Sequence, residues 1–146
     1  MSQVSVLGLD SAKQLFHAVG MDDAGTVIWR KRLTRNGLMP FMAKLPPVGI
    51  GMEACGGAPY WARRVRAQGP TVTLMAPQLV KPYVKSNKHD LADADAMGEA
   101  VSRPTMRFVP IKEVAPQDFQ ALHRVRERRV KAHTALIHEM RGLLQE

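Results

Sequence analysis

The chain has 146 residues, enough for one compact domain with a core, and 45% of them are hydrophobic, which excludes a disordered tail. No apolar run approaches the roughly 20 residues needed to span a bilayer, and the single cysteine excludes an internal disulfide framework. Because no secretory signal is visible at the N-terminus, we expect a cytoplasmic location and no membrane partner. The 21 Lys and Arg residues against 13 Asp and Glu give a formal net charge of +8, which favours a polyanionic partner, usually nucleic acid.

The first third of the chain predicts an antiparallel meander. Apolar and β-branched segments at residues 4–9, 15–20 and 26–33 are separated by short turns, as in consecutive hairpins. A short amphipathic helix should open at Asn36-Gly37 and end before Pro46-Pro47, because the helical conformation is disfavoured before a proline.

Strands and helices alternate in the middle of the chain. Residues 48–52 predict a strand that leads into Glu53, and residues 58–68 predict a helix. Another strand should cover 71–75, and another helix about 90–102. Three strands followed by helix, strand, helix, strand and helix indicate an α/β fold with a mixed sheet flanked by helices. The ribonuclease-H-like fold has this order.

The C-terminal segment predicts one long helix. It should begin at Pro116 and run to the last residue, with apolar residues spaced between charged ones. About 30 residues is long for a helix of a globular protein, so we favour a protruding or coiled-coil helix over an ordinary packing helix. The sequence therefore predicts a globular part, residues 1–115, and a helical extension, residues 116–146. A dimer or higher homo-oligomer is the expected assembly.

Four acidic residues stand where a metal site would need them. Asp10 and Glu53 each follow an apolar strand directly, whereas Asp90 and Asp93 are three apart in a predicted helix and so share one face. Asp95 should point elsewhere. Two divalent ions roughly 4 Å apart, Mg²⁺ or Mn²⁺, can stabilise the attacking and leaving oxygens of a phosphodiester, and such hard ions prefer carboxylate oxygens. Each carboxylate alone is more often a helix cap or a surface charge, but the combination favours a two-metal, phosphodiester-processing site.

Basic residues surround these acids in the sequence. No acidic residue lies between Glu53 and Asp90, whereas six basic residues do. The candidate contacts to nucleic acid are Lys13, Arg63, Arg64, Lys81, Lys85 and Lys88. A solvated basic face is the alternative. Tyr60 and Trp61 could stack on bases, although core packing is the better interpretation of this pair.

Three segments of the chain resemble the DEDD-type transposases of insertion sequences, which are related to the Piv and MooV DNA invertases. These segments are VLGLDSAK (6–13), GMEACGGAPYWARR (51–64) and KSNKHDLADADA (85–96), and the resemblance extends from about residue 4 to the end. It implies that residues 1–115 form a catalytic domain similar to the Holliday-junction resolvase RuvC. The metal-binding acids of the family fall by motif on Asp10, Glu53, Asp90 and Asp93. The resemblance also implies two Mg²⁺ or Mn²⁺ ions, DNA as the substrate and a structured bridge RNA as the guide.

The resemblance is incomplete in one respect. Members of the family continue into a second domain whose catalytic serine bonds covalently to DNA. The serines of this sequence match no such motif, so we assign no nucleophile and expect the chain to end before the serine domain; they are Ser2, Ser5, Ser11, Ser86 and Ser102. The sequence thus predicts the catalytic domain of a transposase that cleaves and transfers DNA strands. The alternatives are a non-catalytic module for nucleic-acid binding and assembly, and a stand-alone nuclease resembling Holliday-junction resolvases.

Overall fold

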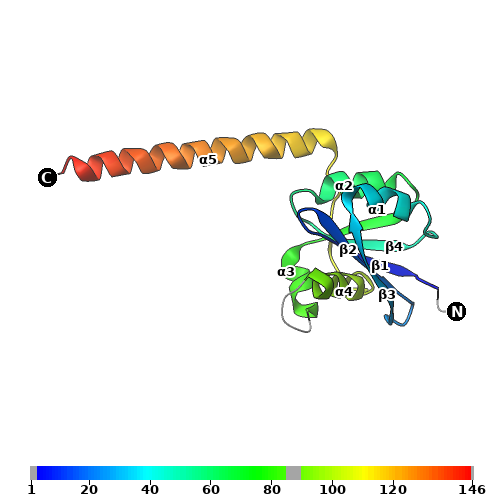
Figure 1. Ribbon diagram of the computed structural model, residues 1–146. Coiled ribbons are helices and arrows are strands. Elements are labelled where there is room, and N and C mark those ends of the chain that lie inside the picture. The colour runs from blue at the N-terminus through cyan, green and yellow to red at the C-terminus, as the bar shows by residue number, and fades with distance from the viewer. Residues whose placement is uncertain (1–2, 85–89, 146) are drawn as a thin grey trace. The chain divides into compact units, whose positions relative to one another are not determined.

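A six-stranded mixed sheet forms the centre of the first unit of the chain, which extends to residue 111, with the strand order β3-β2-β1-β4-β5-β6 (Figure 1). The computed structural model describes residues 3–84 and 90–145, and the side chains of residues 90 and 91 lie outside that description. Strands β1 (Val6–Ser11), β2 (Leu15–Met21) and β3 (Val27–Thr34) form the expected antiparallel meander. The predicted ribonuclease-H-like α/β fold is confirmed.

The parallel strands of the sheet end together. Strand β4 (Gly49–Glu53) pairs in parallel with β1, and β5 (Thr71–Met75) pairs in parallel with β4. Strand β3 has the same direction as β1, because each is antiparallel to β2. The last residues of β1, β3, β4 and β5 therefore lie at one end of the sheet, which we call the carboxyl end.

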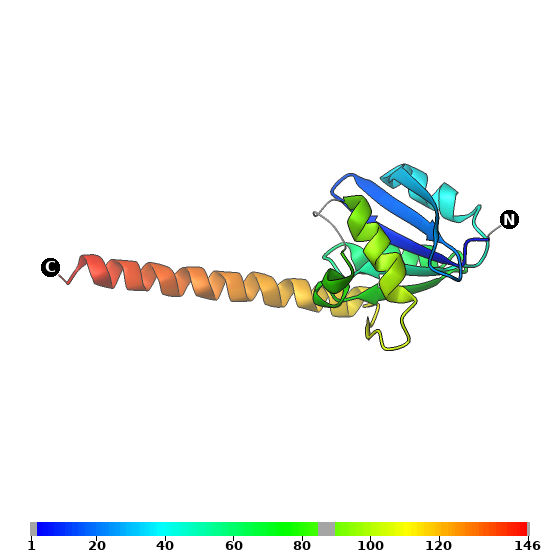
Figure 2. The same cartoon turned by 90° about the horizontal axis from the view of Figure 1, so that it is seen from below.

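Helices cover both faces of the sheet. Helices α1 (Arg35–Met42) and α2 (Ala58–Arg66) lie on one face, and α4 (Asp90–Val101) lies on the opposite face (Figures 1 and 2). The largest core cluster fills the α1/α2 side and includes Leu9, Ile50 and Trp61. Burial on both faces explains why the central strands are almost continuously apolar.

Two glycines allow α4 to lie directly against the sheet. A Cβ atom at Gly8 would overlap the carbonyl oxygen of Ala94 and approach the backbone nitrogen of Gly98 to 2.7 Å. A Cβ atom at Gly51 would lie 3.2 Å from the carbonyl oxygen of Met97. Any side chain at Gly8 would therefore have to displace helix backbone, which cannot move aside as a flexible side chain can.

The same glycines determine where two acidic side chains emerge. Side chains alternate between the faces of a strand, so Asp10 shares the face of Gly8, and Glu53 shares the face of Gly51. Both carboxylates therefore lie on the α4 side of the sheet, just beyond the closest helix contacts.

Helix α5 (Val114–Leu143) belongs to a second unit, residues 112–146, whereas the first unit extends to residue 111. The predicted long helix is present, but it begins two residues before Pro116. Proline is tolerated in a first turn because its missing N–H has no partner there. No residue of α5 is buried. No helix in the described part of the chain is both long and apolar enough to cross a membrane.

Three short elements were not expected from the sequence. They are α3 (Pro77–Val80), the 3₁₀ helix η1 (Lys81–Tyr83) and strand β6 (Phe108–Val109), which pairs antiparallel with β5. Each is too short to show a hydrophobic period; α3 begins with a proline, η1 contains one, and one directly follows β6.

Candidate functional site

A cavity of about 830 Å³ opens at the carboxyl end of the sheet. Its lining includes Asp10 from β1, Glu53 from β4 and Asp93 from α4. These carboxylates come from segments far apart in the sequence. The structure thus brings three of the four predicted acids around one space, which we call the carboxylate cavity.

Each acid reaches this cavity for a local reason. Asp10 is the penultimate residue of β1, Glu53 is the last residue of β4, and Asp93 follows the first residue of α4 by three positions. The Asp10 side chain is only 18% exposed, and Glu53 and Asp93 are half-buried. Asp90 is the first residue of α4, but its side chain lies outside the described part of the structure, so its role remains a prediction.

The cavity suits a hard divalent cation, because three carboxylates line it and such cations prefer oxygen ligands. Among the described residues, however, no three His, Cys, Asp or Glu side chains form a group that could hold a metal ion. The residues therefore match Mg²⁺ or Mn²⁺ in chemistry, while the described set does not by itself make a closed metal site.

A buried histidine faces the first of these acids. His17 on β2 pairs across the ladder with Asp10, and its Nδ1 lies 4.0 Å from Oδ2 of Asp10. His17 is only 4% exposed, so its ring is held in place by packing. It is suited to restricting the orientation of the Asp10 side chain. Sequence reasoning missed His17, because only the strand register places it opposite Asp10.

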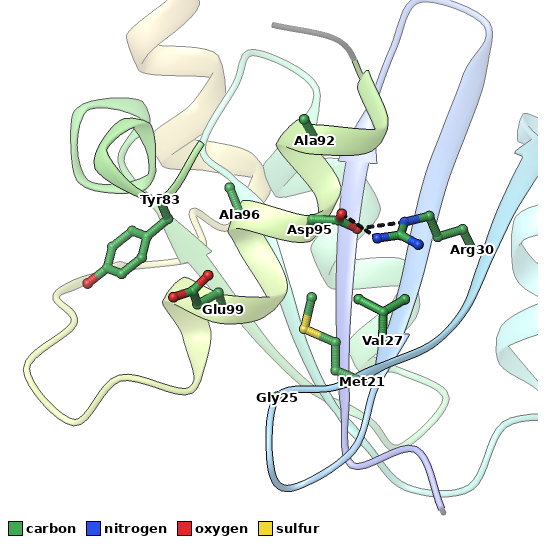
Figure 3. Close-up of a pocket in the computed structure, with 9 residues that line it drawn as sticks. All are labelled: Met21, Gly25, Val27, Arg30, Tyr83, Ala92, Asp95, Ala96 and Glu99. Atoms are coloured by element: carbon green, nitrogen blue, oxygen red, sulfur yellow. Dashed lines mark hydrogen bonds and ion pairs between the residues drawn. The ribbon is translucent and has the colours of Figure 1, made fainter. Parts of the chain in front are cut away.

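A bidentate ion pair ties α4 to the meander (Figure 3). Arg30 on β3 donates from Nε to Oδ1 of Asp95 at 3.1 Å and from Nη2 to Oδ2 at 2.7 Å. The hydrogen bonds to Asp95 raise the pKa of Arg30 above its ordinary value, because they favour the charged guanidinium. Both residues line a separate cavity of about 290 Å³, so Asp95 points away from the carboxylate cavity, as predicted. The pair thus attaches α4 to β3 at Asp95, two residues after Asp93.

Replacing Arg30 by alanine should lower the free energy of unfolding by about 1 kcal/mol, since the pair is bidentate but partly exposed. Asp95→Ala should have a similar effect, and the double variant should lose less than the sum of the two. Urea denaturation of the four proteins measures this coupling. Arg32→Ala, at an exposed arginine of the same strand, is the matched control. Additive losses would contradict a direct interaction between Arg30 and Asp95.

The predicted basic contacts lie in different places. Lys81 lines the carboxylate cavity, whereas Lys13 is exposed in the turn after β1. Arg63 and Arg64 lie on α2, on the other face of the sheet. Lys85 and Lys88 lie outside the described residues. Of the described candidates, Lys81 is thus the cation placed beside the three acids.

The expectation that Tyr60 and Trp61 pack in the core is confirmed for one residue and wrong for the other. Trp61 is 8% exposed and meets Phe16 edge to face, with ring centroids 5.0 Å apart. Tyr60 is 46% exposed. Neighbouring helix positions point about 100° apart, so only one of the two rings can face the sheet.

Comparison with known proteins identifies the family. A family model of DEDD transposases, the IS110 type, matches residues 7–146. The chain is similar to a probable family 20 transposase of Pseudomonas aeruginosa, with 53% identity over 98% of this chain and 42% of that protein. It is also similar to the transposase for insertion sequence element IS1111A of Coxiella burnetii, with 49% identity over 100% of this chain and 40% of that protein. The chain spans about two fifths of the length of these relatives. The resemblance predicted from three sequence segments is confirmed, and the chain belongs to the DEDD transposase family of insertion sequences.

Proposed function

We propose that the carboxylate cavity is the metal-dependent strand-cleavage site of a transposase acting on DNA. The observation that carries this proposal is the convergence of Asp10, Glu53 and Asp93, from three separate elements, on one cavity. Membership in a family of transposases supports the same role. Asp90, on the first turn of the helix that carries Asp93, is proposed as the fourth ligand.

Two Mg²⁺ or Mn²⁺ ions, when bound, would stabilise the attacking and leaving oxygens of the phosphodiester. Asp10 and Glu53 would hold them from the sheet, and Asp90 and Asp93 from α4. Like charges repel, so these carboxylates should draw together only around the cations.

Other residues of the cavity complete the proposed site. Lys81 lines it and would contact a phosphate of the bound strand as a point charge. His17, 4.0 Å from Asp10, would keep that carboxylate turned toward the cavity. DNA ends and target DNA are the proposed substrates. A structured guide RNA belongs to the same proposal and rests on the family resemblance, whereas a homo-oligomer is proposed from the long, exposed helix α5.

One observation favours a second candidate function, a module for nucleic-acid binding and assembly. Helix α5 exposes large apolar side chains such as Phe119, Leu122 and Leu136, which suit packing against a partner. In this alternative the carboxylates would not process DNA.

Strand cleavage tests the proposal. In a transposase of the relatives' full length that contains this chain, Asp10→Asn and Glu53→Gln should each reduce Mg²⁺-dependent cleavage at the element ends about a thousandfold. Losing a ligand removes several kcal/mol of transition-state stabilisation. Asp118→Asn removes the same charge from an exposed position on α5 and should cleave like the wild type. Normal cleavage by either carboxylate variant would refute the proposed site. Rapid cutting of four-way DNA junctions by the chain alone would instead favour a resolvase-like nuclease.

A further inference from the structure

We infer that Tyr60, Arg64 and Arg35 form a stacking surface for an unpaired base of a nucleic-acid strand that reaches the carboxyl end of the sheet. This surface lies on the α1/α2 face, whereas the carboxylate cavity is bordered by α4 on the other face. The inference rests on the proposed function only in that it assumes a nucleic-acid substrate. It adds a contact that neither the carboxylates nor their metal ions provide.

Topology brings these three residues to the carboxyl end. Arg35 is the first residue of α1 and directly follows the last residue of β3. Tyr60 lies in the first turn of α2, which begins shortly after Glu53 ends β4. Because β3 and β4 both end at the carboxyl end, both helices start there, on the same face of the sheet (Figure 1). A nucleic-acid strand bound at Glu53 therefore passes close to this surface.

The Tyr60 ring is held in a fixed orientation although nearly half of it is exposed. Nη1 of Arg64 donates to the Tyr60 hydroxyl oxygen at 3.1 Å, and its guanidinium carbon lies 5.6 Å from the Tyr60 ring centroid. The ring meets that of Trp61 in a T-shaped arrangement, with the ring centroids 5.2 Å apart. An aromatic ring that is already ordered loses little entropy when a base stacks on it.

Trp61 anchors the surface to the core. It is buried and contacts Phe16 of β2 edge to face. Two guanidinium groups lie over it, Arg64 at 5.5 Å and Arg35 at 5.9 Å from the ring centroid. Trp61 thus lies against two exposed arginines, and each keeps N–H donors that can reach the phosphates flanking a stacked base.

The charge around this surface fits a polyanion. Helices α1 and α2 contain no acidic residue, and α2 adds Arg63 and Arg66 to Arg64. Lys31 of β3 continues the basic surface, with its Nζ 5.1 Å from the ring centroid of Phe41 on α1. Exposed aromatic rings among arginines are typical of sites that bind single-stranded nucleic acid without reading its sequence.

Binding of a single-stranded oligonucleotide of about ten nucleotides tests the inference. The oligonucleotide contains 2-aminopurine, is prepared in DNA and RNA forms, and is titrated with the chain in EDTA. We expect Tyr60→Leu to weaken binding about 5- to 100-fold and to abolish the fluorescence change that reports stacking. Tyr60→Phe keeps the ring and should bind within about twofold of the wild type, whereas Arg64→Ala should weaken binding and flatten its salt dependence. The DNA and RNA forms show which strand the surface prefers.

Tyr83→Leu is the matched control. Tyr83 also has an arginine over its ring, Arg103 at 5.8 Å, but it lies beside the separate cavity of Figure 3. This variant should bind like the wild type. Unchanged binding by Tyr60→Leu, equal losses in Tyr60→Leu and Tyr83→Leu, or Tyr60-dependent binding of poly-glutamate would overturn the stacking surface. Because EDTA removes divalent ions, a negative result counts against this surface and leaves the carboxylate proposal to the cleavage assay.

Discussion

Gly8→Ala should lower the free energy of unfolding of the first unit by about 2–3 kcal/mol, the usual cost of overpacking a rigid contact. The added methyl group would meet the carbonyl oxygen of Ala94 and the backbone nitrogen of Gly98, 2.7 Å away. Neither can rotate aside, so α4 would have to move off β1. Urea denaturation followed by circular dichroism measures the loss. Because α4 carries Asp93, the variant should also bind Mn²⁺ more weakly at temperatures where it remains folded.

Gly56→Ala is the control for this experiment. A Cβ atom at Gly56 would meet no other atom within 4 Å, and the residue is exposed. Its stability should change by less than about 0.5 kcal/mol. If Gly8→Ala proved as stable as Gly56→Ala, α4 would not lie against β1 as the structure shows.

Asp93→Asn should remove most of the stabilisation that divalent ions give to the chain. If the carboxylate cavity binds Mn²⁺, ions at 100 times their dissociation constant should add about 2.7 kcal/mol to the wild type. That gain raises the unfolding midpoint by about 10 °C for a unit of this size. Without metal, the variant should be as stable as the wild type or slightly more so, because one of several like charges is gone. Thermal unfolding in Mn²⁺ and in EDTA measures both effects.

Asp118→Asn again provides the control, since it removes one carboxylate from an exposed position on α5. It should keep the full stabilisation by Mn²⁺. Equal stabilisation of the wild type and Asp93→Asn would contradict metal binding by the cavity, whatever the cleavage assay shows.

Local sequence patterns predicted most of the elements. The strand expected at 71–75 is β5 (Thr71–Met75), and the one expected at 15–20 is β2, which extends one residue further to Met21. Alternation and β-branched residues specify a strand wherever one or both of its faces are buried. Strand β6 has only two residues and exists because β5 offers a free edge, which no local pattern reveals.

The proximity of two acidic residues was also predictable from the strands that carry them. Asp10 and Glu53 lie in the last two positions of apolar strands, and parallel strands end on the same side of a sheet, so their proximity followed from sequence and topology together. His17 and the Arg30–Asp95 pair were not predictable. Both depend on strand register and helix docking, which bring together residues such as 30 and 95 that are far apart along the chain.

The sequence by itself determined the α/β element order, the three motif segments and the family. Those properties depend on the types and spacing of residues close together in the sequence, so they can be predicted without the contacts between distant segments. The tertiary structure alone decided that His17 faces Asp10, and that Tyr60 is exposed while its neighbour Trp61 is buried. The physical reason is that burial depends on which side of α2 faces the sheet. That docking is determined by contacts with residues such as Phe16, more than forty positions away in the chain.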